Sequence, residues 1–190
     1  KYVNENNLII NDIFITHHHK DHTSGIEHIK KKFPKVNIHS PSSDIDNTRF
    51  VLHNNDEIET HINSFKIIST PGHTLDHIVY FDKLNKILFS GDTLFRLGCG
   101  RVFEGDINQM YTSLQRINEL DSDIMVYCGH EYTLANLNFL ESTLDKNLYF
   151  NIRKKIEGEL KLNNRSVPFD LKEEKAHNLF LNQDSHIAEL

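Results

Sequence analysis

The stretch that decides the fold of this 190-residue chain is Thr16-His17-His18-His19-Lys20-Asp21-His22, which directly follows an apolar run over residues 11–16. The run predicts a buried strand, so the histidines stand on the loop where that strand ends. Alternate positions of an extended loop point to the same side, and His17 and His19 can therefore converge on one point. Asp21 and His22 then reach a neighbouring point, whereas His18 is expected to face away as a packed or solvent-facing residue.

Three further candidate ligands stand at other strand ends: His73, Asp92 and His130, in the motifs Pro71-Gly72-His73-Thr74, Ser90-Gly91-Asp92-Thr93 and Gly129-His130-Glu131. Each follows an apolar stretch and a glycine, which lets the backbone turn sharply beside a site. A lone histidine or a lone Gly-Asp is more often an ordinary surface or turn residue. Together with the first stretch they supply seven imidazole and carboxylate groups, which suit zinc, iron or manganese. We therefore expect a binuclear metal site.

The rest of the chain alternates strand-like and helix-like segments, which predicts an α/β (α+β) fold. Ser24 and Glu27 have the spacing of a capping box, and Asp106 can cap a second helix. Strands are expected near residues 36–39, 65–69, 78–81, 87–89 and 124–127. The apolar stripe of the second helix consists of Ile107, Met110, Leu114 and Ile117. From Thr133 the pattern becomes helical, so we expect one domain over residues 1–132 and a small helical domain over residues 133–190.

Only one strand precedes the histidine stretch, although a sheet that carries a site at its strand ends should have neighbours on both sides. We therefore expect that the first domain lacks its N-terminal portion and that an exposed sheet edge or a partner chain lies there.

The composition excludes several classes of protein. The net charge is −6, with 21 Lys and Arg against 27 Asp and Glu, so a nucleic-acid partner is not expected. No apolar run approaches the roughly 20 residues that a membrane-spanning helix needs, and no membrane partner is expected. Two separated cysteines favour a reducing compartment, and we expect a cytoplasmic monomer or weak dimer. An organelle is the alternative location if a leader sequence preceded Lys1.

The motifs resemble the metallo-β-lactamase superfamily, and within it the glyoxalase II (hydroxyacylglutathione hydrolase) family. The first histidine stretch, with the later His and Asp positions, marks only the superfamily. The segments Gly98-Cys99-Gly100-Arg101-Val102-Phe103-Glu104-Gly105 and Tyr127-Cys128-Gly129-His130-Glu131-Tyr132-Thr133 are the more specific match. The resemblance covers nearly the whole chain and implies an αββα sandwich followed by a helical, substrate-binding C-terminal domain.

The resemblance also implies a division of roles. His17, His19 and His73 would bind one divalent metal and Asp21, His22 and His130 the other, with Asp92 bridging them. Zinc is the expected metal, and iron and manganese are the alternatives. Asp21 and Asp92 would be the catalytic residues, and the substrate would contact Arg101, Phe103, His130 and Tyr132.

The activity that the resemblance implies is hydrolysis of the thioester S-D-lactoylglutathione, a 2-hydroxyacyl-glutathione, to glutathione and D-lactate, the second step of methylglyoxal detoxification. Two metal ions activate a water molecule for such a reaction without a serine or cysteine nucleophile.

Two departures from the family concern the substrate. Asn182 and Ser185 stand where the family has a basic pair, and Phe103 lacks the hydroxyl group of the usual tyrosine. Lys20 replaces the family's usual aromatic residue in the first histidine stretch. These changes predict weaker attraction for a glutathione carboxylate and leave Arg101 as the main cation.

Other functions of the same fold remain open. A glutathione persulfide dioxygenase uses one iron and would not need Asp21, His22 and His130 as a second site. A β-lactamase would favour a cysteine ligand, and Cys99 occupies no such position. An RNA phosphodiesterase would need a basic channel, and a structural zinc protein favours closed, cysteine-rich coordination.

Overall fold

The computed structural model of the chain describes residues 2–60, 62–144 and 146–182. The helices are α1 (Tyr2–Glu5), α2 (Lys20–Thr23), α3 (Ile26–Lys32), α4 (Ile107–Asn118), α5 (Thr133–Thr143), α6 (Lys146–Asn163) and α7 (Leu171–His177). The strands are β1 (Asp12–Phe14), β2 (Asn37–Ser40), β3 (Phe50–Val51), β4 (Glu57–Glu59), β5 (Ser64–Ser69), β6 (Ile78–Asp82), β7 (Ile87–Gly91), β8 (Leu94–Phe95), β9 (Gly98–Cys99), β10 (Met125–Cys128) and β11 (Phe169–Asp170).

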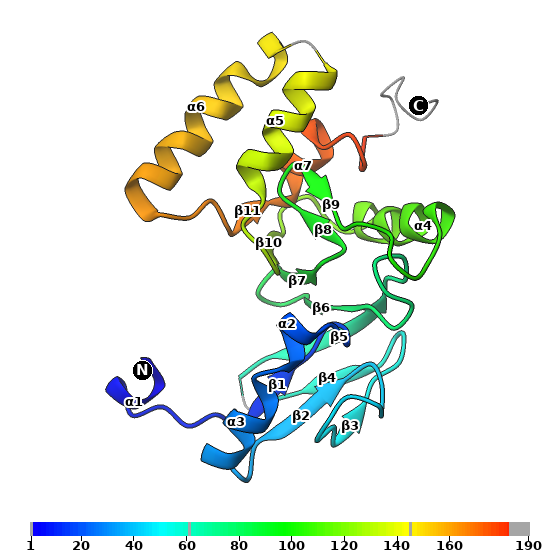
Figure 1. The fold of residues 1–190 in the computed structure, drawn as a ribbon, viewed down its shortest axis with the longest axis vertical. Coiled ribbons are helices and arrows are strands. Elements are labelled where there is room, and N and C mark those ends of the chain that lie inside the picture. The colour runs from blue at the N-terminus through cyan, green and yellow to red at the C-terminus, as the bar shows by residue number, and fades with distance from the viewer. Residues whose placement is uncertain (1, 61, 145, 183–190) are drawn as a thin grey trace.

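Two main sheets form the middle of the molecule (Figure 1). The smaller has the order β1-β2-β3 with parallel pairing, and the larger has the order β11-β10-β7-β6-β5-β4. In the larger sheet β10 runs parallel to β7, whereas the other neighbours are antiparallel. Strands β8 and β9 form a separate hairpin. Within the described residues, β1 pairs with β2 and stands at the edge of its sheet.

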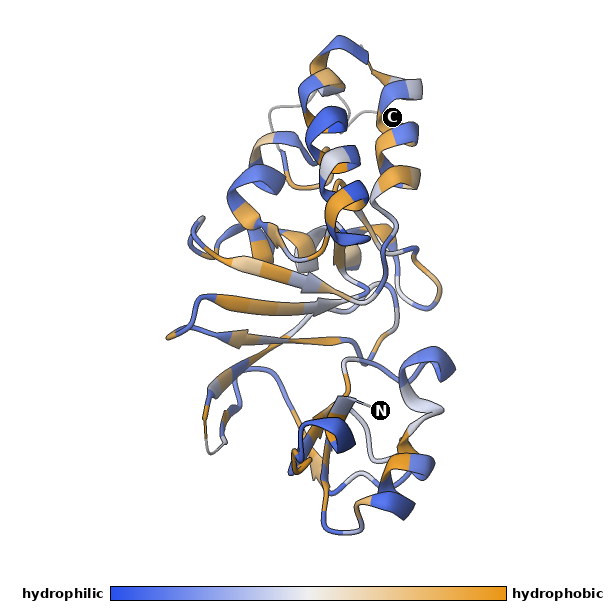
Figure 2. Ribbon diagram, turned by 90° about the vertical axis from the view of Figure 1, so that its left-hand side faces the viewer, coloured by the Kyte–Doolittle hydropathy of each residue, from blue (hydrophilic) through white to orange (hydrophobic). Residues whose placement is uncertain are grey.

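Apolar clusters hold these layers together, and Figure 2 shows the hydrophobic residues along the strands of the larger sheet. One cluster, with Val79, Leu88 and Ile117, fills the space between the larger sheet and α4. A second, with Phe65 and Ile67, lies between the two sheets, and a third packs α3 on the smaller sheet. The sequence of layers is helix, sheet, sheet, helix, which confirms the αββα sandwich expected from the sequence.

The C-terminal segment begins with α5 and α6, which pack against each other around buried Leu137, Leu140 and Ile156. The chain then returns to the sandwich, because β11 pairs with β10 and Leu171 joins the cluster beneath α4. Within the described residues, no helix combines the length and apolar character that crossing a membrane requires.

Several local expectations from the sequence were wrong. The first strand ends at Phe14, and Asp21 and His22 lie on the one-turn helix α2 instead of an extended loop. Helix α3 has Gly25 as its N-cap and no side-chain cap, so the capping box at Ser24 does not form. In α4 the predicted cap at Asp106 is present and forms a capping box with Gln109, but Ile107 is 79% exposed and does not belong to the buried stripe.

Candidate metal centre

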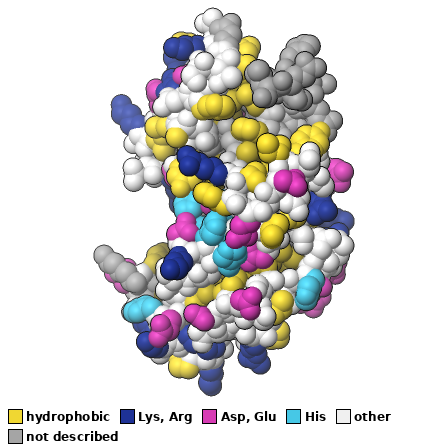
Figure 3. All heavy atoms as spheres, turned by 45° about the vertical axis from the view of Figure 1, so that its right-hand side comes forward, with side chains coloured by type: hydrophobic (Ala, Val, Ile, Leu, Met, Phe, Trp, Pro, Cys, Tyr) yellow, Lys and Arg dark blue, Asp and Glu magenta, His cyan; other side chains and the backbone are white. Residues whose placement is uncertain are grey.

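The seven residues expected to bind metal meet at one end of the sandwich. They come from the loop after β1, from α2, and from the loops after β5, β7 and β10. Figure 3 shows histidine and acidic side chains gathered in a hollow of one face, with basic and hydrophobic side chains around it. The structure therefore brings together four chain segments that are separated by up to 113 residues in the sequence.

His17, His19 and His73 form the first group, in which one ring nitrogen of each lies within 4.8 Å of the others. His73 donates from Nδ1 to the carbonyl oxygen of Arg101 at 2.8 Å. That bond fixes the tautomer, so the lone pair of His73 Nε2 points into the group, 3.0 Å from His19 Nδ1. Burial lowers the pKa of both His17 and His73. Both rings are therefore neutral at pH 7, the form in which imidazole binds a metal.

Asp21, His22 and His130 form the second group, again with ligand atoms within 4.8 Å of one another. His130 Nε2 lies 3.2 Å from Asp21 Oδ2 and 3.3 Å from His22 Nε2. The sequence predicted a neighbouring point for these side chains, and the ligand atoms of Asp21 and His22, both on α2, lie together there.

Asp92 stands between the two groups. Its Oδ2 lies 3.6 Å from His73 Nε2 of the first group and 3.3 Å from His130 Nε2 of the second. Its Oδ1 lies 3.4 Å from His22 Nε2. A carboxylate with an oxygen close to ligands of both groups has the position that a bridging ligand requires.

The donor atoms of this cluster fit divalent cations. His17 Nε2 and Asp92 Oδ1 are buried and have no hydrogen-bond partner. Buried polar atoms normally have one, because leaving one unpaired costs roughly 1–3 kcal/mol. Converging ring nitrogens and carboxylate oxygens, two of them without a hydrogen bond, are an arrangement that a cation would stabilise.

His77 supports the centre from behind. Its ring is completely buried, and its Nε2 accepts a hydrogen bond from the backbone N–H of Asp92 at 3.0 Å. The ring proton is therefore on Nδ1, which lies 2.9 Å from the hydroxyl oxygen of Thr70. Burial lowers the pKa of His77 to about 3, so the ring holds the Asp92 backbone as a neutral acceptor.

Two glycines permit the close approach of these segments. A Cβ atom on Gly129 would lie 2.3 Å from Asp92 Oδ1 and 3.0 Å from His22 Cε1. A Cβ atom on Gly100 would lie 1.9 Å from the carbonyl oxygen of Asp92. Only a residue without a side chain fits at either position, so these glycines belong to the site.

The cluster opens into a cavity of about 800 Å³. Its wall includes His19, Asp21, His73, Asp92 and His130, together with the predicted substrate residues Arg101, Phe103 and Tyr132. Phe103 is 63% exposed, and its ring contacts the rings of His19 and His73. Tyr132 stacks on His130 with ring centroids 5.0 Å apart. These two aromatic rings therefore flank the ligands and leave much of their surface to the cavity.

Arg101 is the single Lys or Arg among the described residues that line this cavity. Asn182 is absent from that lining, and Ser185 lies outside the described residues. The positions that the family fills with a basic pair thus bring no described cation to the cavity.

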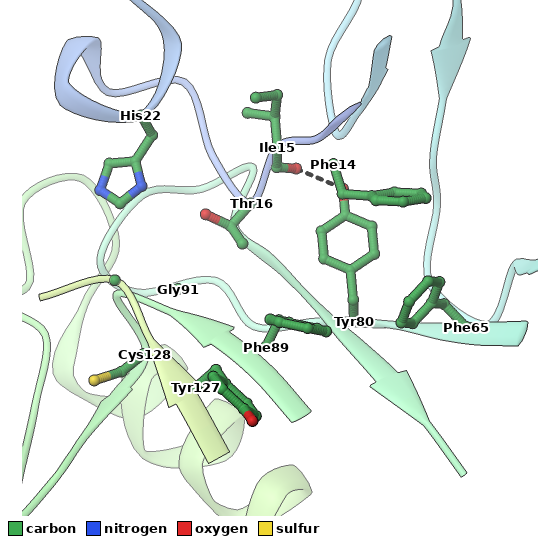
Figure 4. A pocket seen from close by; sticks show the side chains of 11 residues that line it. Phe14, Ile15, Thr16, His22, Phe65, Tyr80, Phe89, Gly91, Tyr127 and Cys128 are labelled. Atoms are coloured by element: carbon green, nitrogen blue, oxygen red, sulfur yellow. Dashed lines mark hydrogen bonds between the residues drawn. The ribbon is translucent and has the colours of Figure 1, made fainter. Parts of the chain in front are cut away.

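A second cavity of about 390 Å³ lies between β1 and the larger sheet (Figure 4). Its wall is mainly aromatic, with Phe14, Phe65, Tyr80, Phe89 and Tyr127, and Tyr80 donates to the carbonyl oxygen of Ile15 at 2.6 Å. His22 is the one predicted metal ligand among its described lining residues. This cavity offers apolar contact, whereas the ligand cluster opens into the other one.

Two acidic residues beside the cluster, Asp76 and Glu104, were not predicted from the sequence. Both contact His18, which was expected to be an ordinary residue. The ring of His18 also lies beside a proposed ligand, because its centroid is 5.3 Å from that of the His19 ring. The position of His18 between two ligand histidines was the one sequence feature that could have drawn attention to it. Its partners Asp76 and Glu104 could not be predicted, because they reach His18 only when two distant loops fold.

Two protein-family models match successive parts of the chain. The family described as metallo-beta-lactamase superfamily matches residues 1–130, and the family described as hydroxyacylglutathione hydrolase C-terminus matches residues 131–189. A hydroxyacylglutathione hydrolase of Citrobacter koseri is 41% identical over 181 residues, which cover 94% of this chain and 71% of the relative. The chain belongs to the hydroxyacylglutathione hydrolase family of the metallo-β-lactamase superfamily.

Solved structures agree with this membership. This chain resembles the crystal structure of ETHE1 from Myxococcus xanthus with a TM-score of 0.69 and 25% identity. The match covers 94% of this chain and 65% of that one. The BLEG-1 B3 metallo-beta-lactamase has the same TM-score at 18% identity, over 95% and 81% of the two chains, and shows the shared fold. The metallo-β-lactamase fold binds divalent metal ions through clusters of histidine and aspartate, as in the groups described above.

Proposed function

We propose that this protein is a metal-dependent thioester hydrolase that cleaves S-D-lactoylglutathione, or a related 2-hydroxyacyl-glutathione, to glutathione and the hydroxy acid. The observation that carries the proposal is the convergence of seven imidazole and carboxylate groups beside a cavity whose wall also contains Arg101. Family membership and the Citrobacter relative support the same activity.

Two divalent ions are proposed, with zinc preferred and iron or manganese as alternatives. His17, His19 and His73 would hold one, Asp21, His22 and His130 the other, and Asp92 would contact both. When bound, such a pair supplies a hydroxide nucleophile near neutral pH and charge stabilisation for the oxyanion. The neutral imidazoles of His17 and His73 support this assignment, as does Asp92 Oδ1, which lacks a hydrogen bond.

The protein's own groups would orient the reacting atoms. Asp21 has a half-exposed carboxylate at the cavity, where it can accept a hydrogen bond from the attacking water and aim its lone pair at the thioester carbon. Attack on the carbonyl forms a C–O bond and breaks the C–S bond, and the thiolate leaves with little need for a general acid. Asp92, held by His77 through its backbone, keeps the two ligand groups at a fixed separation.

Recognition of the glutathione part would depend on the cavity wall. Arg101 can pair with a carboxylate, the Tyr132 hydroxyl can donate a hydrogen bond, and Phe103 and the ring of His130 offer flat apolar contact. Because Phe103 is largely exposed, simple core packing does not explain its position.

The C-terminal part, proposed as residues 133–190, would complete the substrate site of the first domain, residues 1–132. Among the described residues of this part, Ala135 and Asn136 at the start of α5 line the cavity. We further propose that the protein acts in the cytoplasm as a monomer or weak dimer, without nucleic-acid or membrane partners.

The second candidate is a glutathione persulfide dioxygenase. It shares glutathione as carrier, but it would leave Asp21, His22 and His130 without a metal, and these three side chains are brought together here.

A substrate comparison tests the proposal. The purified protein is incubated with S-D-lactoylglutathione, and in parallel with glutathione persulfide in an oxygen electrode. We expect thiol release from the thioester and no oxygen uptake. Oxygen uptake with persulfide, without thioester cleavage, would contradict the proposal and favour the dioxygenase.

A further inference from the structure

His18 stands between two proposed metal ligands, but its ring is directed at two carboxylates on other loops. Its Nδ1 lies 2.9 Å from Asp76 Oδ1, and its Nε2 lies 3.0 Å from Glu104 Oε1. A histidine that contacts carboxylates through both ring nitrogens has its orientation fixed at both ends, even though 41% of its side chain is exposed.

The two carboxylates are themselves held by their neighbours. Asp76 Oδ1 accepts a hydrogen bond from the Thr74 hydroxyl at 2.6 Å, and Glu104 Oε2 accepts one from the backbone N–H of Leu75 at 2.9 Å. Thr74 and Leu75 directly follow His73. The contacts of His18 therefore end on anchored groups and not on mobile surface side chains.

Each loop in this arrangement carries part of the proposed active site. The loop with His18 holds His17 and His19, and the loop with Asp76 holds His73. The loop with Glu104 holds Arg101 and Phe103. Backbone hydrogen bonds already join the last two loops, from Phe103 N–H to the His73 carbonyl at 3.3 Å and from Gly105 N–H to the Gly72 carbonyl at 3.2 Å. His18 connects the first loop to this pair.

We propose that His18 is a positioning residue that ties the loop of His17 and His19 to the substrate loop through Glu104, and so couples metal binding to substrate binding. The inference rests on the proposed function. His18 is not one of the seven proposed metal ligands, although its ring lies against that of the ligand His19, and it acts by limiting the movement of the two loops. Outer residues that orient metal ligands commonly change metal affinity by about 10–100-fold when they are removed.

Substitutions of His18 and of Glu104 test different contacts of this arrangement. His18→Ala removes both contacts, so we expect Zn²⁺ affinity to fall about tenfold and KM for S-D-lactoylglutathione to rise severalfold. Glu104→Ala releases the substrate loop and should act in the same direction. Glu104→Gln should recover most of that loss, because its amide oxygen can accept from Leu75 N–H while its NH₂ group donates to His18 Nε2.

The deciding experiment is a double-mutant cycle with His18→Ala, Glu104→Ala and the double variant. Zn²⁺ affinity is measured by competition with a chromophoric chelator, and KM by steady-state kinetics. His28→Ala, an exposed histidine on α3, is the matched control and should behave like the parent protein. We expect the double variant to have the same Zn²⁺ affinity and the same KM as His18→Ala alone. Full additivity of the two losses would overturn the proposal.

The experiment remains decisive if the proposed function fails or if His18→Ala does not fold. If the parent protein cleaves no thioester, the proposed function fails, and the Zn²⁺ cycle alone decides whether His18 and Glu104 act together. If His18→Ala does not fold, the comparison of Glu104→Ala with Glu104→Gln decides. Equal Zn²⁺ affinity and KM in both Glu104 variants and the parent would then overturn the proposal.

Discussion

Asp92 links the two ligand groups through its side chain and is fixed through its backbone. Its carboxylate oxygens lie 3.3–3.6 Å from ring nitrogens of His22, His73 and His130. Its N–H donates to buried His77. A neutral side chain of the same shape would keep these positions but would remove the negative charge that balances the cations.

Asp92→Asn should therefore lower the bound metal to one equivalent or less and reduce kcat by about a hundredfold or more, because a direct ligand matters more than its outer neighbours. The measurement is metal content by atomic emission together with thioester kinetics. An Asp92→Asn protein with two equivalents of metal and the parent kcat would contradict the bridging role.

Arg101 is the second residue whose role can be tested alone. Loss of one charge-assisted hydrogen bond costs about 1.5–3 kcal/mol, so Arg101→Ala should raise KM for S-D-lactoylglutathione by about tenfold or more with a smaller effect on kcat. Arg165→Ala, which removes an exposed arginine in the loop before β11, is the control. An unchanged KM would mean that the glutathione moiety is not held by Arg101.

At the scale of elements, the end of β10 approaches a proposed ligand side chain closely. Gly129 joins β10 to His130, and a Cβ atom there would overlap Asp92 Oδ1. Gly129→Ala must push the carboxylate or the strand end away. We expect it to lower Zn²⁺ affinity by about tenfold or more while the protein remains folded.

Gly158 provides the matched control for this change. It lies exposed in the middle of α6, and an added Cβ would meet open space. Gly158→Ala should leave Zn²⁺ affinity unchanged and raise the free energy of unfolding by about 0.5–1 kcal/mol. If Gly129→Ala binds Zn²⁺ as tightly as Gly158→Ala, the close approach at β10 does not matter for the metal centre.

The sequence was sufficient to predict the elements whose residues carry a strong local signal. Strands β6 and β7 are short apolar runs between turn residues, and α4 combines the Asp106 cap with a periodic stripe. The ligands were predictable for the same reason, since each stands where such a run ends. Their meeting at one end of the sandwich follows from strands that end at the same edge of a sheet.

Other features depend on contacts that no local pattern contains. Strands β8, β9 and β11 have two residues each, which is too short for an alternation of apolar and polar residues. The start of α3 depends on how α2 turns after His19, and so Gly25 caps it instead of Ser24. The partners of His18 lie 58 and 86 positions away along the chain, which only the folded loops reveal.

In the whole molecule, the C-terminal segment holds the loop that leads to Cys99 and Arg101. Leu97 N–H donates to Glu174 Oε2 at 2.7 Å, and Asn178 Nδ2 donates to the Gly98 carbonyl at 3.0 Å. Buried Arg96 donates to the Ser166 carbonyl and pairs with Glu159. These polar contacts are buried, so the helical part and the sandwich should unfold as one unit.

Glu174 makes the stability of this connection depend on pH. Burial raises the pKa of its carboxyl group from 4.5 to about 7, so the folded state favours the protonated form. The stabilisation is complete below pH 4.5 and is lost as the pH rises through 7. Leu97 N–H and Asn178 Nδ2 both donate to Oε2 of Glu174, and a glutamine can accept both bonds with its single carbonyl oxygen.

Glu174→Gln should therefore be more stable than the parent at pH 8, by on the order of 2–3 kcal/mol, and about equally stable at pH 4.5. Urea unfolding at the two pH values measures the difference. Glu119→Gln, at the exposed end of α4, is the control and should follow the parent. A Glu174→Gln protein that loses stability at pH 8 would show that the ionised carboxylate is required.

The central proposal for the whole molecule is that it hydrolyses a thioester with two bound metal ions. The direct measurement is a Zn²⁺ titration of metal-stripped protein, in which the hydrolysis of S-D-lactoylglutathione and of a nitrocefin-type lactam is followed in the same samples. We predict that thioester cleavage rises until two equivalents are bound and that lactam turnover stays far slower throughout. Full thioester activity without added metal or with one equivalent, or faster turnover of the lactam, would contradict this proposal.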